Sequence, residues 1–448
     1  MNTEISLKQS EYDKYKLSKV FYCLDLMFAN FFNILLAGSY LAKLTSAIGI
    51  SDGMTAILEA LASLASIAQF FTIYISHKPP YKRWVIPFSF FTRITYATLY
   101  LIPFFNLSST SMSFIFFFAM LASKISISIA NPLKTTWYMN LIPRESRGSF
   151  ISIAKIVDTV AGTTVSLAIA YMIDKFEESG NISSAFLLLS GFTFTIAIIN
   201  LFTLLFSKEK EFVKTENKFN SKESLAYLMR NKKYLRYFVI TVLSGLMSSI
   251  ISPFLGTYRI KELGFSMTLI STASFCFSLV YVFGAVLFGK ISRKISYDNI
   301  LRIGYPLFTL SLLGLVFTTP RTGIYMYTIY GVFSNLGHSA IAICITNALF
   351  EFVPYEHQST AIALNTIFIG VASFLSTLAA AYLLSYVQNK ENELFGTTVY
   401  AQQILALIAF ILGIILILFY ELFYIEGYKK IAAYFKRKSE LDFKEHKS

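Results

Sequence analysis

The sequence predicts an all-α membrane protein with twelve transmembrane helices in two six-helix bundles. Of its 448 residues, 55% are aliphatic or aromatic and 15% are charged, whereas soluble domains carry about 25% charged residues. The mean hydropathy of +0.57 includes plainly polar termini and loops, so the apolar residues must be concentrated in long runs. A similar pattern of runs recurs in both halves of the chain. We therefore expect lipid to surround most side chains.

Twelve runs are long enough to cross a hydrocarbon core of about 30 Å at about 1.5 Å per residue. Polar breaks bound each run. In the first half the expected spans are 20–44, 54–75, 84–104, 110–132, 149–173 and 185–206. In the second half they are 238–258, 266–288, 299–319, 325–350, 360–387 and 402–423. These spans predict four regions along the chain: a first bundle (1–206), a polar linker (207–237), a second bundle (238–423) and a basic tail (424–448).

The formal charge of +13 serves as a topology signal. Lys and Arg gather in short segments between alternate spans and at the termini, and such segments stay on the cytoplasmic side. We therefore expect both termini and the linker to be cytoplasmic, and the short loops and Lys- and Ile-rich style favour a bacterial inner membrane. Because the basic residues form no compact face, we expect no nucleic-acid partner.

Several chemistries find no support in the sequence. Cys23, Cys276 and Cys344 lie in apolar runs without metal-ligand spacing, so no metal or cofactor is expected. Residues 284–290 imitate a phosphate-binding loop, but Ile291 replaces the required Ser or Thr and the segment ends a span. Residues 1–19 lack the layout of a cleavable signal peptide, so the first span is expected to direct insertion. We predict no enzymatic activity and no catalytic residue.

The two halves match each other at a nearly constant spacing. An offset of 211 residues pairs Pro143 with Pro354, and an offset of 213 pairs Met54 with Met267. These pairs fall at equivalent places in each six-span half. Agreement on nearly one offset favours duplication over coincidence, and many transporter folds are built from two equivalent bundles.

The segment 142–148, Ile-Pro-Arg-Glu-Ser-Arg-Gly, precedes the fifth span, and 353–356, Val-Pro-Tyr-Glu, echoes it in the second half. With the two-fold layout, these segments resemble the major facilitator superfamily over nearly the whole chain. The loop after the second span keeps only the basic character of the family pattern, and Arg293 stands where the family has an acid. The resemblance implies cytoplasmic gate loops at Arg144, Arg147, Gly148, Gly289 and Arg293.

Ionisable side chains at membrane depth are costly, so each one inside a span is a functional hypothesis. The candidates chosen on this ground are Asp25, Arg93, Lys124, Lys155, Asp158 and His338. Lys155 and Asp158 are spaced i, i+3, so they share a helix face where they can neutralise each other. Arg93 is expected in the same buried charge network, and the resemblance puts its span at the bundle periphery.

The resemblance also implies that the first, fourth, seventh and tenth spans surround the central cavity. Asp25 is our candidate for a proton-coupled acid, because desolvation and nearby cations have opposite effects on a carboxyl group. A permanent salt bridge between Asp25 and Lys124 is the alternative. Six residues are candidates for contact with substrate: Asn30, Asn33, Lys124, Ser248, Asn335 and His338.

These observations predict a secondary transporter that moves a small solute by alternating access, with a proton as the expected coupling ion. A lipid or polymer flippase, or a membrane sensor or assembly protein on the same scaffold, are the alternatives. The expected partners are a small-molecule substrate and the lipid bilayer. We expect a monomer.

Overall fold

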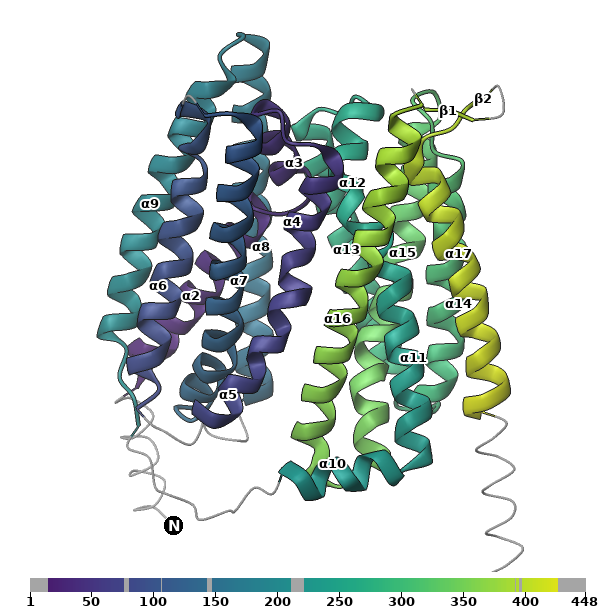
Figure 1. The fold of residues 1–448 in the computed structure, drawn as a ribbon. Helices are drawn as coiled ribbons and strands as arrows, with labels where there is room; N and C mark the ends of the chain where they lie inside the picture. Colours follow the sequence, from purple (N-terminus) through teal and green to yellow (C-terminus); the bar gives the residue numbers. More distant parts are fainter. Residues whose placement is uncertain are drawn as a thin grey trace, which may run out of the picture. The chain divides into compact units, whose positions relative to one another are not determined.

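The protein is described by a computed structural model. It describes residues 15–75, 80–105, 107–142, 147–210, 221–390, 392–394 and 397–425. The first half forms α2 (Lys16–Leu35), α3 (Gly38–Ala47), α4 (Asp52–Ala65), η1 (Ser66–Ala68), α5 (Gln69–Ile75), α6 (Lys82–Leu99), η2 (Ile102–Phe104), α7 (Ser109–Met139), α8 (Arg147–Glu178) and α9 (Ile182–Phe206) (Figure 1).

The second half begins with α10 (Ser221–Arg230) and continues with α11 (Lys232–Ser249), η4 (Ser252–Phe254), α12 (Leu255–Thr257), η5 (Tyr258–Glu262), α13 (Met267–Ile291), α14 (Tyr297–Val316), α15 (Gly323–Phe352), α16 (Tyr355–Gln388), α17 (Ala401–Phe419) and η6 (Tyr420–Ile425). The two-residue strands β1 (Glu393–Leu394) and β2 (Thr397–Thr398) pair antiparallel between α16 and α17.

All twelve expected spans coincide with helices or successions of short helices. Within the described ranges, ten helical segments are long and apolar enough to cross a membrane, and α2 with α3 makes an eleventh if that bent pair is one span. The all-α membrane fold class predicted from the sequence is confirmed. The apolar runs form helices because a spanning segment must satisfy its backbone polar groups internally.

Two of the spans are broken. The first bends by 47° between α2 and α3, and Gly38, the first residue of α3, has a φ of +52°, which glycine adopts readily. The seventh passes from α11 through η4 and α12 to η5. Pro253 lies at this break, where its missing N–H interrupts the helical hydrogen bonds.

Helical structure begins earlier than expected near the middle of the chain. Residues 221–230 of the expected linker form α10, and α11 starts at Lys232. The Asn231 side chain caps α11, because its Oδ1 accepts hydrogen bonds from the backbone N–H groups of Lys233 (3.0 Å) and Tyr234 (3.2 Å). Side-chain capping of this kind fixes where a helix starts.

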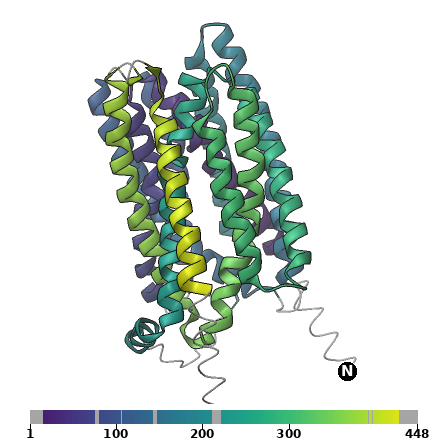
Figure 2. The ribbon, with the colours of Figure 1, turned by 90° about the vertical axis from the view of Figure 1, so that its right-hand side faces the viewer.

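The described chain forms two compact units. Unit 1 comprises residues 1–217, 253–275 and 377–386, and unit 2 comprises 218–252, 276–376 and 387–448. In unit 1, α6 packs against α7 and α9, and α2 packs against α8 and α9. In unit 2, α14 packs against both α15 and α17, which is drawn in yellow in Figure 2. Each unit therefore has its own packed helices.

Candidate functional site

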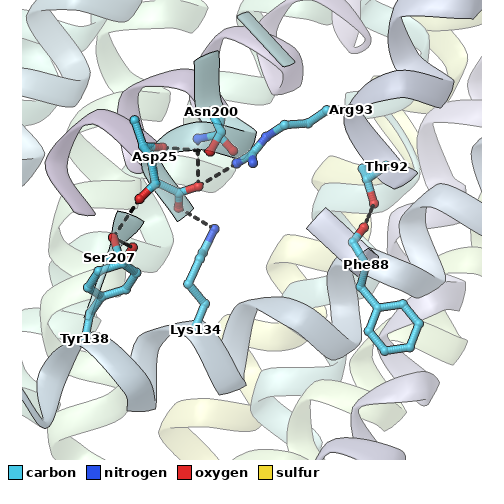
Figure 3. Close-up of polar contacts among 9 residues, drawn as sticks. Asp25, Phe88, Thr92, Arg93, Lys134, Tyr138, Asn200 and Ser207 are labelled. Carbon is cyan, nitrogen blue, oxygen red and sulfur yellow. Dashed lines mark hydrogen bonds and ion pairs between the residues drawn. The ribbon is translucent and has the colours of Figure 1, made fainter. Parts of the chain in front are cut away.

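A buried carboxylate lies at the centre of unit 1. Asp25 on α2 is fully buried, and its Oδ1 lies 2.7 Å from Nη2 of Arg93 on α6. Its Oδ2 lies 2.7 Å from Nζ of Lys134 on α7. Asn200 on α9 donates a hydrogen bond from Nδ2 to Oδ1 at 3.0 Å. Figure 3 shows these side chains converging on Asp25 from four helices.

This charge cluster, Asp25 with Arg93, Lys134 and Asn200, carries two cations and one anion. Arg93 is 2% exposed and Lys134 is 3% exposed, so neither cation reaches water directly. Removing the single anion from such a buried network would leave two uncompensated cations, which is strongly unfavourable. All four residues belong to unit 1. The cluster is suited to hold α2, α6, α7 and α9 together.

Aromatic and hydroxyl side chains surround the charge cluster. Tyr22, Trp137 and Tyr138 belong to one buried apolar group, and the rings of Tyr22 and Tyr138 stand 4.5 Å apart. The Tyr138 hydroxyl lies 2.8 Å from Ser207 Oγ. Because these rings exclude water from one side of Asp25, the interactions within the cluster are strengthened.

Unit 2 contains a cavity of about 310 Å³ among α11, α15 and α16. Its polar lining consists of Tyr237, Thr241, Ser244, Ser248, Asn365 and Thr366, and its apolar lining of Gly245, Ile345, Leu349, Ile362 and Ile369. No lining residue is charged. The cavity therefore offers neutral hydrogen-bonding groups beside aliphatic walls, as solute sites often do.

Asn365 supplies the side-chain amide of the cavity lining. Its side chain is 7% exposed, and its Oδ1 accepts no hydrogen bond from any residue in the described ranges. The neighbouring Tyr237 hydroxyl donates to the backbone oxygen of Ile345 at 3.0 Å. A buried acceptor without a protein donor is costly unless another group satisfies it. Asn365 can therefore accept a hydrogen bond from a solute in the cavity.

The expected substrate residues of the first half occupy different surroundings. Asn30 donates from Nδ2 to the backbone oxygen of Asp158 at 3.3 Å, so it joins α2 to α8. Asn33 is exposed. Lys124 places its Nζ 5.4 Å from the centre of the Tyr96 ring, a cation–π contact. The alternative that paired Asp25 with Lys124 is not realised, because Arg93 and Lys134 occupy the carboxylate.

The expected substrate residues of the second half also separate. Ser248 lines the unit 2 cavity. Asn335 bonds within its own helix, from Nδ2 to the backbone oxygen of Gly331 at 2.8 Å. His338 is exposed, with its ring 4.3 Å from that of Phe308, and it does not line the cavity. Of these three, only Ser248 meets the hydroxyl and amide groups described above.

The other charge and gate residues are only partly described. Asp158 is buried on α8, whereas the side chain of Lys155, one turn away, lies outside the described residues. Arg144 and the side chain of Arg147 also lie outside them, and the burial of Gly148 is not described. At the end of α13, Gly289 borders open space and Arg293 is exposed. Arg93 pairs with Asp25, whose other carboxylate oxygen pairs with Lys134.

Sequence reasoning missed Lys134, Asn200, Asn365 and Glu59. The fourth span was expected to end at residue 132, but α7 continues to Met139 and carries Lys134 into the interior. Glu59 lies inside the expected second span, and the rule that selected the other buried charges would have found it. Asn200 and Asn365 carry no charge, and nothing in the sequence distinguishes them from other amides in spans.

The comparisons with known proteins agree with this fold. A family model described as Major Facilitator Superfamily matches residues 237–432. A mutant of the nucleoside transporter NupG has a TM-score of 0.70 at 12% identity, over 89% of this chain and 98% of that one. A D-xylose–proton symporter has a TM-score of 0.68 at 15% identity, over 91% of this chain and 97% of that one. No curated protein matches the sequence.

A third solved structure extends this likeness. A bacterial homologue of the human lysosomal transporter Spinster, inward-facing and unoccupied, has a TM-score of 0.65 at 13% identity, over 91% of this chain and 96% of that one. The family match covers the second half, and the fold matches cover both halves. The second half of the chain therefore matches the major facilitator superfamily in sequence, and both halves share the fold of these solved structures.

Proposed function

We propose that this protein is a secondary transporter that moves a small, polar, uncharged solute by alternating access and that a proton gradient drives the movement. The neutral cavity of unit 2 carries the proposal, because its hydroxyl and amide groups suit a solute rich in hydroxyl or amide groups. Its volume of about 310 Å³ is at the lower end of the range of small-molecule sites. A bacterial inner membrane with both termini cytoplasmic is the location we propose, from the distribution of Lys and Arg.

Asp25 remains the residue that sequence reasoning nominates for proton coupling. Its geometry favours a structural role, because a proton can bind there only if Arg93 or Lys134 withdraws. Both cations belong to the same compact unit as Asp25, so alternating access does not by itself require their separation. We therefore assign Asp25 to the stability of unit 1 in this proposal and look elsewhere for the coupling group.

Solute binding to unit 2 can be tested by thermal-shift screening of the purified full-length protein. The panel includes nucleosides and D-xylose, named from the structural neighbours, with other neutral polyols and amides. A bound solute raises the unfolding temperature because it stabilises the native state alone. We expect Asn365→Leu to weaken the apparent affinity about tenfold, since a buried hydrogen-bonding partner is lost.

Asn347→Leu is the matched control, because Asn347 lies on α15 outside the cavity lining and bonds to the Ile343 backbone oxygen at 2.7 Å. This variant should bind the solute as the unmodified protein does. If the unmodified protein and both variants bind the solute with equal affinity, the unit 2 cavity is not the binding site. A stabilising solute that carries a net charge would contradict the proposed substrate class.

A further inference from the structure

Glu59 places a carboxylate inside a candidate membrane span. It lies on α4, within the span Asp52–Thr72. Its Oε2 accepts a hydrogen bond from the backbone N–H of Gly38 at 3.0 Å. Gly38 is the first residue of α3, directly after the bend in the first span. The first N–H groups of a helix have no partner within the helix, so a carboxylate there is favoured.

The same glycine contacts the broken seventh span. A Cβ atom at Gly256 would lie 2.5 Å from the backbone oxygen of Gly38, so the backbones of α12 and α3 touch here without intervening side chains. Gly38, Glu59, Gly256 and Arg259 together make what we call the Glu59 joint. The joint connects two helix breaks, one from each half of the sequence, within unit 1.

Two cations act on the Glu59 carboxylate. Arg259 on η5 and Lys124 on α7 both attract it electrostatically. Three other charged groups on the surrounding elements engage different partners. Lys43 on α3 pairs with Glu177, and Lys261 on η5 pairs with Asp52 at 2.5 Å. Asp174 on α8 accepts hydrogen bonds from the N–H groups that begin α13, at 2.8 and 2.7 Å.

We propose that Glu59 is a proton-binding site and that protonation loosens the Glu59 joint. The ionised carboxylate accepts a charge-assisted hydrogen bond from Gly38 and offsets the charge of two cations. When the carboxylate takes a proton from water, it becomes a neutral acid. The hydrogen bond to Gly38 then weakens, and the carboxyl group no longer offsets the charges of Arg259 and Lys124.

Glu59 differs from Asp25 in the way its carboxylate is held. Asp25 makes direct ion pairs with two cations, whereas Glu59 accepts a hydrogen bond from a neutral backbone N–H. Burial favours the neutral acid and the two cations favour the carboxylate, so the protonation state of Glu59 depends on the position of η5. Movement at the joint and proton binding are thereby linked. As the coupling site for transport, Glu59 rests on the proposed function.

Hydrogen exchange of the full-length protein in lipid nanodiscs tests the joint without any solute. The exchange rate of the peptide that contains Gly38 is measured from about pH 5 to about pH 8 and divided by the rate of the unfolded peptide at each pH. In the unmodified protein we expect protection to fall about tenfold toward low pH, as the charge-assisted hydrogen bond weakens. Glu59→Gln should show the low protection throughout, and Glu59→Asp should retain a pH dependence.

Asp52→Asn is the matched control, because Asp52 lies on the same helix and pairs with Lys261 while the Gly38 N–H bonds to Glu59. It should keep the pH dependence at Gly38. Protection that does not change with pH in the unmodified protein would overturn the proposal, whether or not any variant folds. Because this measurement involves no solute, a negative result leaves the proposed transport standing. Absence of transport with a normal pH response at Gly38 would instead refute the proposed function.

Discussion

At the scale of single residues, one carboxylate, that of Asp25, pairs with both cations of the charge cluster. Arg93 and Lys134 each lie 2.7 Å from one of its oxygens. Both cations are nearly inaccessible to water. A single anion between two buried cations makes the three positions unequal, because the loss of the anion leaves two uncompensated charges and the loss of one cation leaves a balanced pair.

We therefore expect Asp25→Asn to lower the free energy of unfolding by about 3–5 kcal/mol. Lys134→Met should cost less, because the ion pair between Asp25 and Arg93 remains. The measurement is the unfolding temperature of each purified variant, followed by tryptophan fluorescence. If Lys134→Met is the more damaging change, the balance of charge described here is wrong.

The sequence identified part of this cluster. Asp25 and Arg93 stood out because any charge within an apolar run is conspicuous. Their pairing could not be predicted, because hydropathy gives the depth of a residue but not its direction around the helix axis. Lys134 was taken for a loop residue, since Pro132 follows a polar Asn and resembles the end of a span. The structure shows Pro132 inside α7, where one face of the last turns, with Lys134, Trp137 and Tyr138, is buried.

At the scale of elements, unit 1 depends on a close approach of α12 to α3. Only glycine at 256 permits this contact, because a Cβ atom there would lie 2.5 Å from a backbone oxygen and 2.6 Å from a backbone carbon of Gly38. The backbone cannot move aside as the end of a flexible side chain can. The two broken spans therefore meet at a position that tolerates no added atom.

Gly256→Ala should cost about 1–3 kcal/mol of stability, as overpacking does elsewhere. It should also raise hydrogen exchange in the peptides that contain α3 and η5. Gly191→Ala is the matched control, since Gly191 lies on α9 with open space around its Cβ position. That variant should be neutral or slightly more stable. Equal behaviour of the two variants would show that the close approach does not contribute to stability.

Elements were the most predictable level of the structure. The apolar runs predicted each span to be helical, because a helix satisfies its backbone hydrogen bonds within the segment that crosses the membrane. The breaks were not predicted. Leu36 to Gly38 and Ile251 to Pro253 lie in apolar surroundings, so hydropathy runs through them without interruption. Only the backbone shows that the first span bends and that the seventh is divided.

At the scale of the whole molecule, the buried charge sites described above and the neutral cavity lie in different units. The cluster around Asp25 and the Glu59 joint both belong to unit 1, and the neutral cavity belongs to unit 2. Such a division suits a transporter in which one unit responds to the coupling ion and the other contacts the solute. The two halves of the sequence were expected to differ in this way, because five of the six candidate ionisable residues within spans lie in the first half.

The most direct test of the account is concentrative uptake by the full-length protein in sealed proteoliposomes, for the solute that thermal-shift screening identifies. We predict that an imposed pH gradient accumulates the solute above its outside concentration, and that a protonophore reduces uptake to equilibration. Glu59→Gln should equilibrate the solute without accumulating it. Uptake that reaches the same level with and without the gradient would contradict proton coupling, and uptake no faster than in protein-free liposomes would contradict transport itself.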